Sequence, residues 1–192
     1  ISSDCSGGLT LSQDFAHTLT IDANVTDSLY TIPMYSYYIR DIVINSGRTV
    51  TATRAYPFRF SNGSSSSANF NSLTNNGTIS NAGYAIMFDT HQGSGDTTLE
   101  TLTNNGSIVS SAAAIMLSTA GSSINNLINT GTISTANSHA PVYLTASGAS
   151  VTNFTNTGTL AGNSGSGIDF NNYLGTVTNF SNKQGKSTTN PL

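Results

Sequence analysis

The chain has 192 residues, only 8% of them charged, and its formal net charge is -3. This weak, slightly acidic charge excludes the basic surface that nucleic-acid-binding domains and binders of anionic membranes carry. The length allows one or two domains and is sufficient for a continuous core.

Residues 1–40 are predicted to form an N-terminal cap and a first, irregular coil. Short apolar-polar alternations typical of strands occur here, at Leu9, Leu11, Leu19, Ile21 and Val25. A tyrosine-rich segment around Pro33 follows, and atypical segments of this kind usually cover the end of a solenoid.

Features of the whole chain add three expectations. Cys5 is the single cysteine, so it either pairs outside this chain or is a free thiol. The sequence begins at Ile1 without a basic-then-apolar leader, and we expect a mature or trimmed product. No run of 18 apolar residues occurs, so no transmembrane helix is expected.

From Asp41 onward the chain repeats one motif. LTNNGTI at 73–79 returns as LTNNGSI, LINTGTI and FTNTGTL, with a degraded copy, FSNKQGK, at 180–186 and an earlier relative, VINSGRTV, at 43–50. The motif glycines are separated by 30, 29, 25, 27 and 27 residues, and they are Gly47, Gly77, Gly106, Gly131, Gly158 and Gly185. A loosely kept period near 27 indicates a solenoid or an array.

Each repeat carries three apolar clusters, which predicts three short strands per coil. The first cluster is the glycine motif itself. The second contains apolar pairs two residues apart that should both point inward, such as Ile86 with Phe88 and Ile115 with Leu117. The third places an apolar residue three before the next motif, as in Leu99 with Leu102, and the step of three predicts a bend or bulge.

These observations predict an all-β, right-handed parallel β-helix with coils of about 27 residues. Helical repeats are disfavoured because every unit contains Asn and Gly and lacks runs of helix-forming residues. A propeller blade would need about 40 residues and four strands. The coils should cover residues 41–186, and residues 187–192 should form a disordered tail.

One asparagine recurs two residues before the motif glycine in five units and three residues before Gly185 in the last, and we expect it to stack from coil to coil. Aligned amides would donate to one another in a structural ladder, and the neighbouring glycine would permit a positive φ in the turn. The alternative is an exposed row that faces a ligand. The ladder residues are Asn45, Asn75, Asn104, Asn129, Asn156 and Asn182.

Between Asp41 and Gly185 the pattern of these residues resembles the passenger domains of bacterial autotransporters, in the style of the adhesin and vacuolating-toxin-like branches. The resemblance implies a surface-displayed, outer-membrane-associated or secreted fragment that mediates adhesion to host cells or aggregation of bacterial cells. Its partner would be a host-cell receptor, a surface glycan or the same protein on another cell. The family's translocator barrel is expected in the parent chain and is absent from this sequence.

A second hypothesis is a polysaccharide-degrading β-helix enzyme, and a third is a fragment of a vacuolating or pore-forming toxin. Asp89 and Asp169 are predicted to lie three coils apart, which is about 14 Å, whereas glycosidase carboxyl pairs need about 5 to 9.5 Å. Glu100 is the single glutamate. We therefore predict no catalytic carboxylate pair.

Other catalytic and metal sites are not predicted either. GNSGSG at 162–167 resembles the nucleophile loop of serine proteases, but it has Asn163 where that loop has Asp. The three histidines, His17, His91 and His139, are irregularly spaced and lie near no candidate Ser and Asp. GSGIDF at 165–170 resembles a calcium-binding nonapeptide repeat but has no tandem copy. No metal, cofactor or catalytic residue is therefore predicted.

A group of arginines and tyrosines near the N-terminus is the candidate binding site. Arginine binds anions through its forked guanidinium and tyrosine stacks on sugar faces, so the group could bind sialylated or sulfated glycans. The alternative is packing of the cap with solvated arginines. The residues are Arg40, Arg48, Arg54, Arg59, Tyr35, Tyr37 and Tyr56.

Several Asn-x-Ser/Thr sequences could accept a glycan. Asn24 has the strongest local context, because Asp22-Ala23-Asn24-Val25-Thr26 resembles the acidic extended acceptor sequence used by some bacteria. A chain this rich in Asn, Ser and Thr also produces such sequences by chance. Five other matches begin at Asn62, Asn76, Asn105, Asn153 and Asn179.

Overall fold

The computed structural model describes residues 5–6, 18–27, 32–35, 40–53, 56–61, 67–89, 96–137, 139–163, 165–170 and 175–183. The regular secondary structure in these ranges consists of β-strands, which form three sheets of seven, seven and six strands. Within these ranges no helix is long and apolar enough to cross a membrane.

The three sheets, here named A, B and C, are built from strands that recur in the same order along the chain. Sheet A contains β1 (Cys5–Ser6), β3 (Val25–Asp27), β6 (Thr49–Ala52), β9 (Thr78–Asn81), β12 (Ser107–Ser110), β15 (Thr132–Thr135) and β18 (Thr159–Ala161). Sheet B contains β2 (Thr18–Ile21), β5 (Asp41–Ile44), β8 (Ala68–Asn75), β11 (Thr97–Asn104), β14 (Ser123–Asn129), β17 (Ser150–Asn156) and β20 (Thr176–Asn182). Sheet C contains β4 (Ile32–Tyr35), β7 (Phe58–Ser61), β10 (Ile86–Phe88), β13 (Ile115–Leu117), β16 (Val142–Leu144) and β19 (Ile168–Asp169).

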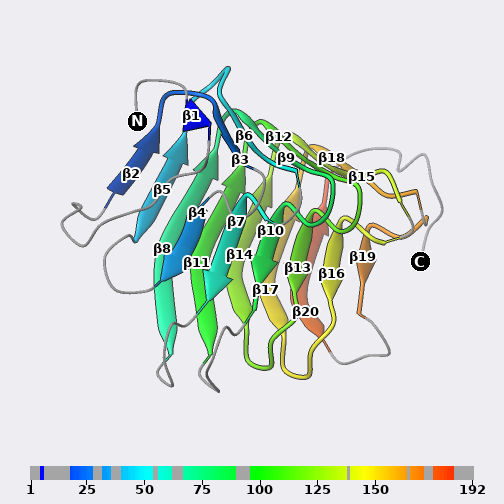
Figure 1. The fold of residues 1–192 in the computed structure, drawn as a ribbon. Coiled ribbons are helices and arrows are strands. Elements are labelled where there is room, and N and C mark those ends of the chain that lie inside the picture. The colour runs from blue at the N-terminus through cyan, green and yellow to red at the C-terminus, as the bar shows by residue number, and fades with distance from the viewer. Residues whose placement is uncertain are drawn as a thin grey trace.

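Strands inside each sheet pair in parallel with the strand one coil before and the strand one coil after, and the strands at the sheet ends pair with one neighbour, as Figure 1 shows. One coil therefore contributes one strand to each sheet, and equivalent positions are separated by 29, 25, 27 and 26 residues from Asn75 to Asn182. This confirms the predicted parallel solenoid with three strands in coils of about 27 residues.

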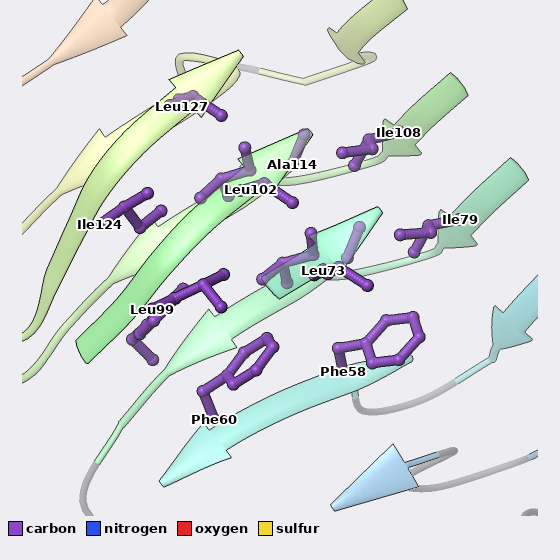
Figure 2. Packing of buried hydrophobic residues seen from close by; sticks show 14 of the residues in the cluster. Phe58, Phe60, Leu73, Ile79, Leu99, Leu102, Ile108, Ala114, Ile124 and Leu127 are labelled. Atoms are coloured by element: carbon purple, nitrogen blue, oxygen red, sulfur yellow. The ribbon is translucent and has the colours of Figure 1, made fainter. Parts of the chain in front are cut away.

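The core is a set of apolar columns that run along the solenoid axis. In one column Leu73, Leu102 and Leu127 pair in register, and each is fully buried. Ile79 and Ile108 belong to a second column on sheet A, and Phe58 and Phe60 belong to two more on sheet C. Figure 2 shows these side chains converging from the three sheets. The predicted inward pairs of the second cluster, Ile86 with Phe88 and Ile115 with Leu117, are also fully buried.

The long strands of sheet B change direction at the predicted step of three. Phe70 and Leu73 both point inward in β8, although an undisturbed strand would turn residues three apart to opposite faces. The backbone N–H groups of Asn71 and Ser72 both donate to the Arg40 carbonyl, at 2.8 and 3.0 Å. Two residues of β8 thus lie opposite one residue, Arg40, directly before β5, which is the arrangement of a bulge.

The glycine in the repeated turn has a different role from the predicted one. Gly77, Gly106, Gly131 and Gly158 do not have positive φ, whereas Gly47 does, with φ 75°. A Cβ atom on Gly131 would lie 2.0 Å from the Gly106 carbonyl oxygen of the previous coil. A Cβ atom on Gly158 would likewise lie 2.1 Å from the Gly131 carbonyl oxygen. Close stacking of successive turns, and not backbone conformation, therefore requires glycine here.

The described part of residues 1–40 extends the solenoid. β2, β3 and β4 pair with β5, β6 and β7, so one coil precedes Asp41, and β1 pairs with β3 at the end of sheet A. The tail predicted at 187–192 lies outside the described residues.

Candidate functional site

Four of the predicted ladder asparagines are buried, and their side chains hydrogen-bond from coil to coil. The side-chain nitrogen of Asn75 donates to Oδ1 of Asn104 at 2.8 Å, and Asn104 donates to Asn129 at 2.7 Å. Asn129 donates to Asn156 at 2.6 Å, and Asn156 donates to the exposed Asn182 at 3.0 Å. This buried amide column lies inside the solenoid at the end of sheet B, where a partner could not reach it.

The buried amides also fix the turn that follows them. Asn75, Asn104 and Asn129 each donate a second hydrogen bond to a backbone carbonyl at the start of the next coil's sheet-A strand, at 2.9 to 3.0 Å. Oδ1 of Asn75 accepts from the Gly77 N–H at 3.2 Å. Because each amide joins two coils, and Asn75 and Asn104 also bond their own turns, the column acts as scaffold.

The prediction that Asn45 belongs to this column is wrong. Asn75 pairs with Ile44, because the turn from Ile44 to Thr49 contains four residues, 45–48, where the turn from Asn75 to Thr78 contains two. The extra residues move Asn45 out of register, and its side chain bonds to Asp22 instead. Two aliphatic residues, Ile21 and Ile44, occupy the positions before Asn75 in the column.

The described arginines of the predicted arginine-tyrosine group lie at separate places on the solenoid. Nε of Arg48 bonds Asp22 at 3.0 Å on the exposed surface, whereas Nε of Arg59 bonds Asp89 at 2.7 Å on sheet C. Arg40 is exposed, directly before sheet-B strand β5. Arg54, Tyr37 and the side chain of Tyr35 lie outside the described residues. The described arginines are therefore spread over different faces and do not form one anion site.

The ion pair between Arg48 and Asp22 has an electrostatic consequence. A hydrogen bond from Arg48, a second from Asn45 and the charge of Arg48 together lower the pKa of Asp22. Both side chains are substantially exposed, so the pair is solvated and contributes little to stability.

A row of aromatic rings beside sheet C was not predicted. Tyr56 lies 6.0 Å from Tyr84, Tyr84 lies 6.4 Å from His139, and His139 lies 5.1 Å from Tyr143, measured between ring centroids. The four residues are half-buried, and we name them the aromatic row. Their sequence signal is an aromatic residue two or three positions before a sheet-C strand, at Tyr56, Tyr84 and His139.

The backbone that carries the aromatic row is fixed from inside. Asn81, Ser110 and Thr135 form a paired column at the end of sheet A, and they are 7%, 2% and 8% exposed. Their side chains donate to the carbonyl groups of Tyr84, Ala112 and His139, at 2.6, 3.0 and 2.8 Å respectively. A shallow groove of about 380 Å³, lined by small residues such as Ala82, Val109 and Ala136, lies at the same corner.

The two aspartates considered for catalysis occupy different surroundings. Asp89 is bound to Arg59, which is only 8% exposed. Asp169 pairs with Tyr143 in sheet C and lies three coils after the coil of Asp89. This spacing corresponds to about 14 Å. Among the described residues no group of three or more His, Cys, Asp or Glu side chains could hold a metal ion.

The candidate glycosylation site Asn24 is exposed, and its Oδ1 accepts a hydrogen bond from the Thr49 N–H at 3.0 Å. Asn153 and Asn179 lie on the outward face of sheet B and form an exposed amide pair at 2.8 Å. Asn76 and Asn105 are bonded in the same way at the turn, at 2.9 Å. Glycan attachment at these residues remains a prediction.

Comparison with known proteins does not assign the chain to a family. No protein-family model matches the sequence, and neither a curated protein nor a solved structure matches it.

Proposed function

We propose that this chain is a non-catalytic part of an autotransporter-like passenger. It is displayed on the surface of a bacterium or released from it, and it mediates adhesion to host cells or aggregation of bacterial cells. The carrying observation is the stack of near-identical coils, joined by the buried amide column, because such a stack forms an elongated scaffold with long side surfaces.

The composition and location of the side chains support the same proposal. Outward positions of sheet B carry mainly Thr, Ser and Asn, with the amide pairs Asn126–Asn153 and Asn153–Asn179 bonded along the surface. Charge is sparse on the whole chain, at 8% of residues. A long, polar face with few charges, among them Glu100 in β11, suits contact with a cell surface better than recognition of nucleic acid.

An adhesion assay tests this proposal directly. Beads coated with the purified chain are incubated with epithelial cells, and bacteria displaying the chain are followed in a settling assay. Beads coated with an unrelated β-solenoid of similar charge serve as control. We expect saturable binding that soluble chain inhibits, or accelerated settling. Binding and settling equal to those of the control would overturn the proposal.

Two alternative functions have separate readouts. Release of reducing ends from a panel of polysaccharides, lost in Asp169→Asn, would indicate a degrading enzyme. Asp89→Asn is less informative, because it also leaves the nearly buried Arg59 without its ion partner. Oligomerisation on lipid vesicles with leakage of their contents would indicate a toxin fragment.

A further inference from the structure

We propose that the aromatic row, Tyr56, Tyr84, His139 and Tyr143, is a binding surface for an extended, neutral oligosaccharide. The inference rests on the proposed adhesive function and names the class of ligand that this function would use. It shares Tyr56 with the predicted arginine-tyrosine group but includes none of that group's arginines.

The first argument is the direction of the row. Tyr56 belongs to the coil of β7, Tyr84 to the coil of β10, and His139 and Tyr143 to the coil of β16. The row therefore runs along the solenoid axis over three coil steps, about 14 Å at about 4.8 Å per step. A linear chain of sugar rings is an elongated ligand that can lie along such a row.

The second argument is that Tyr84 and His139 contact each other although the coil between them contributes no aromatic residue to the row. Tyr84 and His139 are two coils apart, and the coil between them has Ala112 and Ala113 at the matching positions. Because these alanines are small, the two rings approach to 6.4 Å above them. The ring centroids from Tyr56 to Tyr143 thus follow one another at 5.1 to 6.4 Å, and the apolar C–H faces of sugar rings stack on aromatic rings.

The third argument is preorganisation. Asn81 and Thr135 are at least nine-tenths buried, and they hold the carbonyl groups of Tyr84 and His139 from inside the solenoid. The backbone that carries two of the rings is therefore fixed before a ligand arrives. A fixed surface loses less conformational entropy on binding, which raises affinity.

The charges near the row favour a neutral ligand. Arg59 and Asp89 neutralise each other at 2.7 Å on sheet C. Asp169 lies next to Tyr143 in the pairing of β16 with β19, so this end of the row carries a carboxylate. A carboxylate repels sialylated and sulfated sugars, whereas tyrosine hydroxyl and imidazole groups can hydrogen-bond to neutral sugar hydroxyls.

The test measures binding of soluble oligosaccharides to the full chain. The neutral probes are β-glucan, galactan and mannan oligosaccharides, and the anionic probes are sialyllactose and heparin fragments. The chain has no tryptophan, so its tyrosine fluorescence reports binding directly, and NMR shifts locate it. We expect at least one neutral probe to bind with a Kd below about 1 mM. Its shifts should centre on Tyr84, His139 and Tyr143.

Matched variants make the result specific. Tyr84→Ala and Tyr143→Ala should weaken binding by about tenfold or more, equivalent to about 1.4 kcal/mol. Tyr84→Phe and Tyr143→Phe retain the rings and should bind within about threefold of the unchanged chain. Ile128→Ala removes an exposed apolar group from sheet B and should not affect binding. Circular dichroism and thermal melting establish that each variant is folded.

Three outcomes would overturn the inference: no neutral probe binds, only anionic probes bind, or folded alanine variants bind as tightly as the unchanged chain. The result is separable from the proposed function. Cell adhesion that persists in folded Tyr84→Ala overturns the glycan site and leaves adhesion standing. Oligosaccharide binding without any cell adhesion or aggregation overturns the adhesive function and leaves the glycan site standing.

Discussion

Single residues in the buried amide column carry more stability than their size suggests. Asn104 is fully buried, accepts from Asn75, and donates to Asn129 and to the Thr132 carbonyl. Asn104→Ala leaves the buried Oδ1 of Asn129 and the partly buried Thr132 carbonyl without this donor. We therefore expect the free energy of unfolding to fall by about 2–4 kcal/mol, measured by urea denaturation.

Asn153→Ala is the matched control, because Asn153 also bonds asparagines of the neighbouring coils but lies on the exposed face of sheet B. Water replaces its lost hydrogen bonds, so the free energy of unfolding should change by less than about 1 kcal/mol. Equal losses for the two variants would show that burial of the amide column is not what makes it stabilising.

Tyr143 provides a pH-dependent prediction. Burial raises the pKa of Tyr143, and the nearby Asp169 and Tyr84 add to the rise. Asp169→Asn removes one of these causes, so the pKa of Tyr143 should fall toward its ordinary value of about 10. Phenolate absorbance, with Tyr143→Phe to assign the signal, measures the change. An unchanged or higher pKa in Asp169→Asn would contradict it.

The raised pKa of Tyr143 also predicts how the free energy of unfolding changes at alkaline pH. The raised pKa of Tyr143 belongs to the folded state, whereas the unfolded chain titrates near about 10. The contribution to stability is therefore complete below about pH 10 and is lost as the pH rises through the folded pKa. Asp169→Asn should lose less stability across this window than the unchanged chain does.

The sequence predicts most of the amide column but not its boundary. Asn75, Asn104 and Asn129 recur two residues before a glycine, and this spacing corresponds to one position in a conserved turn geometry. Asn45 has the same spacing, but its turn is two residues longer, and spacing from the glycine cannot reveal that. The role of Gly131 was also hidden, because a clash with Gly106 appears only when coils stack.

At the scale of the strand, the alternation of faces in β11 is a testable feature. Leu102 is fully buried, and Thr103 next to it points outward and is half-buried. Leu102→Asp places an unpaired charge in the core, so we expect the chain to unfold or its melting temperature to drop sharply. A loss below about 0.5 kcal/mol would refute the register.

Thr103→Asp tests the same strand from its other face. The introduced carboxylate is solvated there, and the free energy of unfolding should change by about 1 kcal/mol or less, measured by the same thermal and urea unfolding. If Thr103→Asp were as damaging as Leu102→Asp, low strand propensity of aspartate and not burial would explain both losses.

Strand-level features differ in how far the sequence predicts them. The three strands per coil and the inward pairs such as Ile86 with Phe88 follow from apolar spacing, because the core selects the same positions in every coil. The aromatic row could not be predicted in this way. Tyr84 and His139 meet across a coil of alanines and do not occupy equivalent positions, so no repeat marks their contact.

At the scale of the whole molecule, each coil is stabilised mainly by the coils on either side of it. The column that contains Leu73, Leu102 and Leu127 continues to Phe154 and Phe180. Phe154 is 1% exposed because β20 covers it, whereas Phe180 in β20 is 49% exposed. Local stability should therefore fall toward β20.

Phe154→Ala and Phe180→Ala test this gradient, because they make the same change at equivalent positions of two neighbouring coils. The centroids of the two rings lie 5.1 Å apart. Phe154→Ala empties a buried site and should lower the free energy of unfolding by about 3–5 kcal/mol. Phe180→Ala removes a half-exposed ring and should cost about 1 kcal/mol. Amide exchange should be faster in β20 than in β14, because among the described strands β20 pairs only with β17, whereas β14 pairs with strands on both sides. Equal losses, together with equal exchange rates, would instead mean that the solenoid unfolds as a single unit from β20 to its first coil.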